Sequence, residues 1–461
     1  MSDKRIEKDS LGEVEVPANA LWAAQTQRAI DNFPVSGRPM PGAFIHAVVR
    51  IKRSAARANA VLGLLDADRA QAIETACDEV LGGAHADQFP VDVFQTGSGT
   101  STNMNVNEVI ARLASNHSSE PVNPNDHVNM SQSSNDVIPT AIHLSAVTEV
   151  HESLLPALDH LMQTIAGREK ETESVVKTGR THLMDAMPVT VAQELRTWRD
   201  QISNARDRLE QAAKDLLRIP QGGTAVGTGV NAHADFARLF AEELSALTDH
   251  HFTAMEHPFV GQSAIDAPVA LSSAYRGLGT VVMKIANDLR WMNSGPIHGL
   301  GEITLPALQP GSSIMPGKVN PVIPESAAMV AAQVTGLDAT VNTAGQSGNF
   351  QLNVMLPLVG WNLLEMNGLL SNTARVMADK AIAGFTVNSD VMAEAVGKNP
   401  VLVTTLNPVI GYAKAAEVAK KAYATGRSIL DVAKEETDVP EDELRDLLDP
   451  IKQTKGGLPD A

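Results

Sequence analysis

The stretch LSSAYRGLGTVVMKIANDLRWM, residues 271–292, carries large apolar side chains at alternating steps of three and four residues. They are Leu271, Tyr275, Leu278, Val282, Ile285, Leu289 and Met292. Because an α-helix has about 3.6 residues per turn, this spacing puts them all on one narrow face. Such a face is typical of long helices in coiled coils and bundles, which cross at about 20°. The stretch therefore predicts one long helix of a helical bundle.

Four further segments repeat this spacing, at 144–165, 191–216, 327–344 and 356–377. Pro156 lies inside the first of them, where we expect a kink. Helices longer than about 25 residues are unusual in a compact unit. We therefore expect their Ala- and Leu-rich faces to continue their burial across subunits. The pattern predicts an all-α fold in which residues 134–389 form a central bundle of five long helices within a homo-oligomer.

The segments on either side predict two smaller, mainly helical domains. Residues 1–133 mix shorter helices, such as 43–64 and 68–82, with loops rich in Gly, Pro and Asn. In residues 390–461 the helices shorten again. There, Ser428 is predicted to cap one helix. Pro440 fits the first turn of another, and the acidic residues after it suit the positive end of that helix.

Composition excludes several classes of protein. The chain has 461 residues, 4% aromatic residues and a single cysteine, Cys77, so neither a disulfide framework nor a cysteine-based zinc site is expected. Its start is charged where a signal peptide would be apolar, and no run of about 20 uncharged apolar residues occurs. These features predict a soluble cytoplasmic protein that does not interact with a membrane.

The net charge of −17 argues against nucleic acid as a partner, since no basic stripe offsets it. An anionic ligand would have to be attracted locally, by loops, helix starts and a few cations, because the overall field repels it.

A polar loop at Gly311–Pro321, reading GSSIMPGKVNP, has the strongest functional signal. It places two hydroxyls, Ser312 and Ser313, before one cation, Lys318. A loop of this composition can turn its N–H groups inward and form an anion-binding concavity in which a hydroxyl acts as a base or nucleophile. It is not a phosphate-binding P-loop, because the glycine spacing differs and Val319 stands where a metal-binding Ser or Thr is required. The alternative is an ordinary surface loop.

Three more polar loops lie between the predicted helices. They are Thr96–Asn105 with Asn107 and Glu108, Asn123–Asp126 leading to Met130–Asp136, and Gly179–Asp185. Each alone is explained by turns and helix caps. The glycine-rich stretch Gly222–Gly229 suggests dinucleotide binding, but it lacks the strand–Gly-x-Gly-x-x-Gly–helix context and is interpreted as a loop that connects helices.

With these four loops in this order, the chain resembles the fumarase/aspartase superfamily along almost its whole length. The GSSIMPGKVNP stretch matches the signature of that superfamily, and the closest resemblance is to class II fumarases, which interconvert fumarate and L-malate. The resemblance implies a homotetramer with one large central helical bundle. It also implies active sites built from three subunits and no metal or other cofactor.

Two alternatives to class II fumarase are open. Aspartase, which releases ammonia from L-aspartate, usually has Gln, Thr and Ala where this chain has His182, Ser134 and Gly317. Gln351, in contrast, favours aspartase, and Ile297 replaces an Arg that is common in the superfamily. A non-catalytic structural protein, like lens crystallins related to argininosuccinate lyase, would be expected to have damaged loops, and these loops are intact.

The resemblance also implies roles for individual residues. Ser312 is the expected base, His182 is expected to handle the departing or attacking water, and Glu325 to orient His182. Lys318 and Asn320 are expected to hold one substrate carboxylate. The remaining residues expected at the substrate are Ser98, Gly99, Thr100, Ser133, Ser134, Asn135, Thr181, Ser313 and Val319. A second, non-catalytic anion site maps to Asn123, Pro124, Asn125 and Asp126, although its first residue is usually His.

Overall fold

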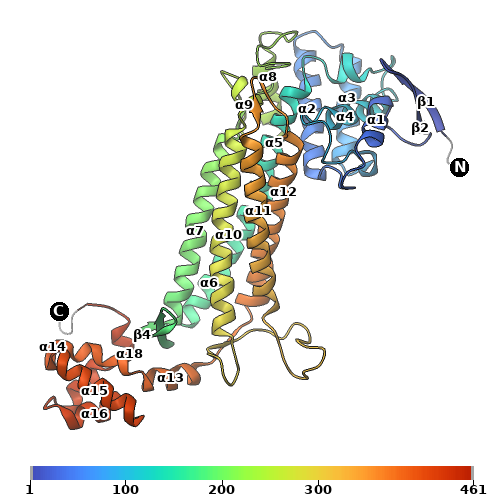
Figure 1. Ribbon diagram of the computed structural model, residues 1–461. Coiled ribbons are helices and arrows are strands. Elements are labelled where there is room, and N and C mark those ends of the chain that lie inside the picture. Colours follow the sequence, from blue (N-terminus) through green and yellow to red (C-terminus); the bar gives the residue numbers. More distant parts are fainter. Residues whose placement is uncertain (1–3, 458–461) are drawn as a thin grey trace. The chain divides into compact units, whose positions relative to one another are not determined.

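The computed structural model describes residues 4–457, and these residues are mostly helical, as the sequence predicted (Figure 1). The first and last few residues of the two predicted flanking domains, 1–3 and 458–461, lie outside the described residues. The helices are α1 Ala24–Asn32, α2 Gly42–Val61, α3 Ala67–Leu81, α4 Thr100–Ala114, α5 Ser134–Glu149, α6 Leu155–Glu171, α7 Val191–Asp215, α8 Phe236–Thr248, α9 Phe259–Ser263, α10 Asp266–Met292, α11 Val322–Gly345, α12 Leu356–Met377, α13 Ser389–Lys398, α14 Asn407–Ile410, α15 Tyr412–Thr425, α16 Ile429–Glu436, α17 Glu441–Leu447 and α18 Pro450–Gln453.

The helices are accompanied by short two-stranded sheets, which the sequence pattern did not predict. The strands are β1 Lys4–Asp9, β2 Gly12–Pro17, β3 Val176–Thr181, β4 Met184–Thr190, β5 Arg218–Ile219, β6 Thr253–Ala254, β7 Ile303–Thr304, β8 Gly348–Asn349, β9 Leu352–Asn353 and β10 Thr386–Val387. The pairs are β1–β2, β3–β4, β5–β6, β7–β10 and β8–β9, and of these only β5–β6 is parallel.

The chain divides into two compact units. Unit 1 comprises Met1–Pro156, Ala205–Gly279 and Ala331–Ser371, and unit 2 comprises Ala157–Asn204, Thr280–Val330 and Asn372–Ala461. The division into three domains stays a prediction. Within residues 4–457, no helix combines the length and the apolar character needed to cross a bilayer. A cytoplasmic location also stays a prediction.

In unit 1, the parts of the long helices that belong to it bury the predicted apolar faces and join them by a few buried polar contacts. Tyr275 of α10 donates a hydrogen bond to Asn367 of α12 at 3.1 Å, and burial raises the pKa of its phenol. Ser272 of α10 donates to Asp338 of α11 at 2.6 Å. Leu271, Tyr275 and Leu278 are fully buried. The three-four spacing therefore identified the buried faces correctly.

The helix that contains Pro156 is interrupted by a π-helical turn, Val150–Leu154, between α5 and α6. Proline has no N–H to donate to the preceding turn, and π-turns and prolines are the usual places where a helix departs from regular geometry. The predicted irregularity is therefore present as a π-turn, while a kink stays a prediction.

In unit 2, a hairpin of β3 and β4 precedes α7. Trp198 of α7 is buried and donates its indole N–H to Asp288 of α10 at 3.1 Å. Glu169 of α6 is buried and accepts hydrogen bonds from Arg196 and Arg199 of α7, each at 2.7 Å. These paired charges fix α6 and α7 side by side within the unit.

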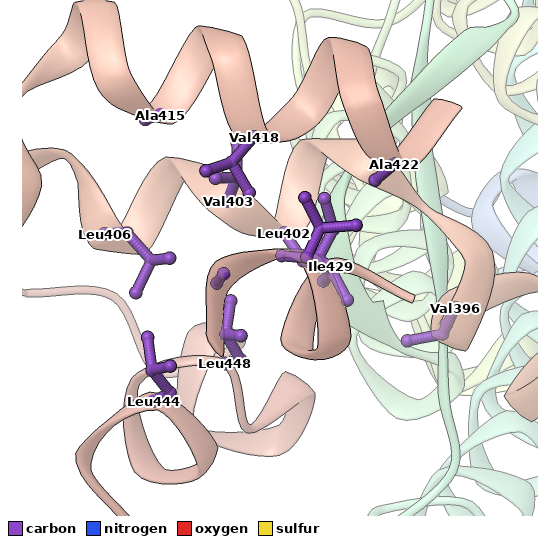
Figure 2. Packing of buried hydrophobic residues seen from close by; sticks show 12 residues of the cluster. Val396, Leu402, Val403, Leu406, Ala415, Val418, Ala422, Ile429, Leu444 and Leu448 are labelled. Carbon is purple, nitrogen blue, oxygen red and sulfur yellow. The ribbon is translucent and has the colours of Figure 1, made fainter. Parts of the chain in front are cut away.

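The C-terminal part of unit 2 has an apolar cluster of its own, to which Leu406, Val418, Ile429 and Leu444 belong (Figure 2). Ser428 caps α16, as predicted, by accepting a hydrogen bond from the N–H of Asp431 at 3.1 Å. The prediction for Pro440 is corrected by one position. It is the residue before α17 rather than in its first turn, and the three acidic residues that follow it occupy that turn.

The buried His143 of α5 gives a prediction of pH-dependent stability. Its Nδ1–H donates to the carbonyl oxygen of Leu216 at 3.0 Å, and burial lowers its pKa to about 4. The unfolded chain binds a proton near pH 6.5, so the fold loses stability as the pH falls from 6.5 to 4. Between pH 6.5 and 4, we expect the free energy of unfolding of His143→Gln to fall by roughly 3 kcal/mol less than that of the wild type. Denaturant unfolding at a series of pH values measures the difference.

The matched control for this measurement is His257→Gln, because the His257 side chain is 75% exposed. That variant is expected to follow the wild-type dependence on pH. If His143→Gln and the wild type lost the same free energy between pH 6.5 and 4, the burial of a neutral imidazole would not be the cause of acid sensitivity.

Candidate functional site

The Gly311–Pro321 loop folds so that backbone N–H groups converge on one hydroxyl. Oγ of Ser312 accepts hydrogen bonds from the N–H of Ile314 at 3.3 Å and of Met315 at 3.0 Å. Gly311 is required here, because a Cβ at this position would collide with the backbone carbonyl oxygen of Lys318. The loop thus has the inward-turned N–H groups that the sequence predicted.

The second half of this loop is tied back to its start. Lys318 donates to Oδ1 of Asn320 at 2.6 Å, and Nδ2 of Asn320 donates to the carbonyl oxygen of Gly311, also at 2.6 Å. Lys318, Asn320 and Glu325 line one pocket of about 450 Å³ with Arg290 and Asn293. Three of the predicted site residues are therefore brought together, and Glu325 lies in the first turn of α11.

His182 lies at the tip of the β3–β4 hairpin. Thr181 pairs with Met184, and the two residues between them, His182 and Leu183, have φ values of 57° and 61°. Positive φ at both central positions is what a two-residue hairpin turn of type I′ requires. The turn leaves His182 and Thr181 exposed. The structure thus presents the predicted acid–base residue on a short, defined turn of unit 2.

The first two loops contact each other in unit 1. Ser98 and Thr100 share a hydrogen bond of 2.8 Å, and Thr100 begins α4 after the buried Gly99. Asn103 of α4 donates to Oγ of Ser134, the first residue of α5, at 3.2 Å. The hydroxyls predicted to contact the substrate thus come from the starts of two helices, where the helix dipole favours anions.

The start of α5 is fixed by a capping box. Ser133 accepts from the N–H of Asn135, while Asp136 accepts from the N–H of Ser133 at 2.9 Å. Asp136 is fully buried and also accepts from the N–H groups of Gly222 and Thr224 at 3.0 and 2.8 Å. Burial raises the pKa of Asp136 to about 6. The Gly222–Gly229 stretch is therefore a loop that braces α5, in agreement with its interpretation as a connection.

At the predicted second anion site, the Asn123 side chain already occupies the N–H groups that an anion would use. Its Oδ1 accepts from the N–H of Asn125 at 2.8 Å and of Asp126 at 2.9 Å, which caps the short π-helix Pro124–Val128. An anion at this position would have to displace that amide oxygen. Binding there stays a prediction.

Three residues that the sequence did not indicate lie beside the predicted loops, two of them in unit 2 and one in unit 1. Arg290 and Asn293, from the end of α10 and just after it, line the pocket of Lys318. Lys52 of α2 is fully buried and contacts the first two loops. Arg290 and Lys52 carry charge on predicted helices, where a charged side chain usually indicates a solvated face, so no sequence signal distinguishes them.

Comparisons with known proteins identify the family of this chain. A family model described as Lyase matches residues 12–336, and one described as Fumarase C C-terminus matches residues 402–455. A class II fumarate hydratase of Pseudomonas aeruginosa is 58% identical to this chain over 458 residues, which cover 99% of this chain and 100% of that protein. One from Xylella fastidiosa is 57% identical and covers 98% of this chain and 96% of that protein.

Among solved structures, a class II fumarase from Schistosoma mansoni matches with a TM-score of 0.95 and 37% sequence identity. The match covers 98% of this chain and 99% of that chain. The chain therefore belongs to the lyase family, and the resemblance to the fumarase/aspartase superfamily is confirmed. Within that family, its full-length relatives place it among the class II fumarate hydratases.

The close packing at Gly311 gives a prediction for the loop. A methyl group at this position would collide with the Lys318 carbonyl oxygen, so we expect Gly311→Ala to loosen the loop around the exposed Lys318–Val319 peptide bond. Limited trypsin digestion, followed by mass spectrometry, should show cleavage after Lys318 that is faster by roughly tenfold, because the free energy of local unfolding of the loop is lower.

The control is Gly167→Ala in α6, where an added Cβ meets nothing within 4 Å. Cleavage after Lys318 should keep its wild-type rate in that variant. Equal rates of cleavage after Lys318 in Gly311→Ala and the wild type would show that the loop does not require a residue without a side chain at position 311.

Proposed function

We propose that this chain catalyses the reversible hydration of fumarate to L-malate through an aci-carboxylate intermediate. The observation that carries the proposal is the Ser312 oxygen, which accepts two backbone N–H groups in a loop that also holds Lys318 and Asn320. This environment suits a hydroxyl that must exist transiently as an alkoxide.

In the dehydration direction, the Ser312 alkoxide takes a proton from C3 of L-malate. The electron pair of that C–H bond moves into the neighbouring carboxylate and gives the aci-carboxylate. The electron pair then forms the double bond between C2 and C3, while the C2–OH bond breaks. The hydroxide leaves with a proton from His182 as water. Hydration runs through the same steps in reverse.

Each residue in this scheme answers a physical requirement. Imidazole suits proton exchange near neutrality because its unperturbed pKa is about 6.5. Glu325 would orient His182 and stabilise its charged form. The developing charge on the carboxylate needs fixed donors, and we assign this role to Lys318 and Asn320 with Ser313 and Val319. Closure of the loop would exclude water and complete this environment.

We assign the other end of the substrate to the loops of unit 1. The residues are Ser98, Gly99, Thr100, Ser133, Ser134 and Asn135, and Thr181 of the β3–β4 hairpin joins them. Neutral hydroxyls and amides hold a carboxylate by hydrogen bonds without needing a charge of their own. A second, non-catalytic anion site at Asn123–Asp126 remains part of the proposal.

We further propose a homotetramer in which loops from three subunits complete each site. Over residues 331–345, the exposed positions of α11 carry only uncharged side chains, among them Ala332, Thr335, Gly336 and Ala339. Asp338 on the same segment is 7% exposed and is already bonded to Ser272 and Arg276. A long helix with no solvated charged face is typical of one that packs against further helices, which supports assembly through α11.

The function is tested with the wild-type chain and L-malate in metal-free buffer. We expect the ultraviolet absorbance of fumarate to rise and the reverse reaction to consume fumarate. L-aspartate in place of L-malate should release no ammonia, which separates this activity from that of an ammonia-lyase. Ammonia release with no change in L-malate would overturn the proposal in favour of aspartate ammonia-lyase.

The role of Ser312 is tested by Ser312→Ala. We expect turnover of L-malate to fall by at least roughly 10³-fold, since the base is lost and the N–H groups of Ile314 and Met315 have no alkoxide left to stabilise. Analytical ultracentrifugation should show the same oligomer as the wild type. Ser326→Ala, at an exposed serine of α11, is the matched control and should keep its rate. A Ser312→Ala variant with normal turnover would remove Ser312 from the role of base.

A further inference from the structure

Lys52 is a buried ammonium group to which the described residues, 4–457, offer no carboxylate as hydrogen-bond partner. It lies on α2 with no exposed surface. Its Nζ donates to Oδ1 of Asn103 at 2.7 Å, Oδ1 of Asn129 at 3.0 Å and Oε1 of Gln132 at 3.0 Å. All three N–H donors of the ammonium group are therefore used, and all three acceptors are neutral amides.

Burial of a charge among neutral groups costs free energy that must be compensated elsewhere. Asp136 is the carboxylate whose charge acts on Lys52, but its oxygens accept the N–H groups of Ser133, Gly222 and Thr224. Burial lowers the pKa of Lys52 to about 7, so much of the cost remains in the free protein. A bound anion nearby would offset this cost and stabilise the charged form.

The hydrogen bonds of Lys52 lead to a residue assigned to the substrate. Asn103 accepts from Lys52 through Oδ1 and donates through Nδ2 to Oγ of Ser134. A cation on the carbonyl end of an amide makes its N–H a stronger donor, and hydrogen bonds in a chain polarise one another. Since Ser134 accepts from Asn103, its own O–H is free to donate to a ligand. Asn129 and Gln132 lie just before Ser133 on the same loop.

We propose that Lys52 is a positioning residue that supplies positive potential to one carboxylate of the substrate through Asn103 and Ser134. The inference rests on the proposed function, because Ser134 is a substrate residue only within it. It explains how a chain of net charge −17 can hold a dianion with loops of hydroxyls and amides. Lys52 need not touch the ligand.

The decisive variant is Asn129→Asp, because it places a negative charge beside Lys52 at almost unchanged shape. The new carboxylate keeps an acceptor for Lys52, Asn103 and Asn107, and the one donor lost is that to the carbonyl oxygen of Gln132. A purely structural role for Lys52 predicts equal or higher thermal stability and an unchanged KM. The proposed role predicts that KM for L-malate rises at least roughly tenfold while kcat changes less than threefold. A tenfold rise in KM is the effect expected for one unit charge that acts over about 10 Å at an effective dielectric constant near 20.

Lys52→Met provides the second test by removing the charge itself. We expect KM for L-malate to rise by a similar factor. The melting temperature should fall as well, because three amide oxygens lose their donor. Inhibition by succinate, a dianion, should weaken more than inhibition by its monoamide, since the lost term is electrostatic. Equal weakening of the two inhibitors would overturn the proposal even in a destabilised variant.

The matched control is Asn116→Asp, the same change of side chain at an exposed asparagine just beyond the end of α4. It should change KM less than threefold. A wild-type KM in Asn129→Asp, or a fall in its kcat alone, would overturn the role of Lys52. Titration calorimetry with succinate compares the affinities of these variants without turnover. A chain that binds succinate but does not convert L-malate would contradict the proposed function, and the calorimetric comparison would still test the role of Lys52.

Discussion

Burial of apolar faces along the long helices is the constraint on which the rest of the structure depends. Because those faces lie along one side of each helix, the chain can change direction only at helix ends, and the polar loops are therefore forced to those ends. Buried pairs such as Tyr275 with Asn367 and Ser272 with Asp338 fix the register of neighbouring helices, since an unpaired polar group at these positions would be costly. The end of a loop is held in place where it joins such a helix. A catalytic group on the loop requires this fixed position.

The sequence predicted the features that arise from helical periodicity and from local chemistry. The spacing of Leu271, Tyr275 and Leu278 identified a buried face correctly, and the composition of Gly311–Pro321 indicated a loop with inward-turned N–H groups, which the structure contains at Ser312. Residues 4–17 and the β3–β4 hairpin were missed. Strand β3 reads Val-Lys-Thr-Gly-Arg-Thr, in which apolar and polar residues do not alternate, so it has no period of two from which a strand could be predicted.

Lys52 could not be predicted from the sequence for a different reason. A lysine on an amphipathic helix usually has a solvated ammonium group, and only the three-dimensional convergence of Asn103, Asn129 and Gln132 reveals a buried one. Those acceptors are 51, 77 and 80 residues away along the chain. Distant partners of this kind carry no local signature. The same holds for Asp136, whose partners at Gly222 and Thr224 come from a stretch that could be mistaken for a nucleotide-binding motif.

The hairpin that carries His182 is held by buried charges rather than by apolar packing alone. The Glu302 carboxylate, on a residue that is 3% exposed, has its oxygens 2.5 Å from Nζ of Lys177 and 2.6 Å from a guanidinium nitrogen of Arg180, both on β3. Nζ of Lys177 also lies 2.8 Å from a carboxylate oxygen of Glu194 of α7. An ion pair of this kind adds little net stability against an apolar replacement, but it permits one arrangement only, because any shift leaves a buried charge unpaired. Arg180 is two residues from His182. A strand held in this way, ending in a short turn, therefore fixes the backbone position of His182. Its imidazole ring stays exposed and accessible to a ligand.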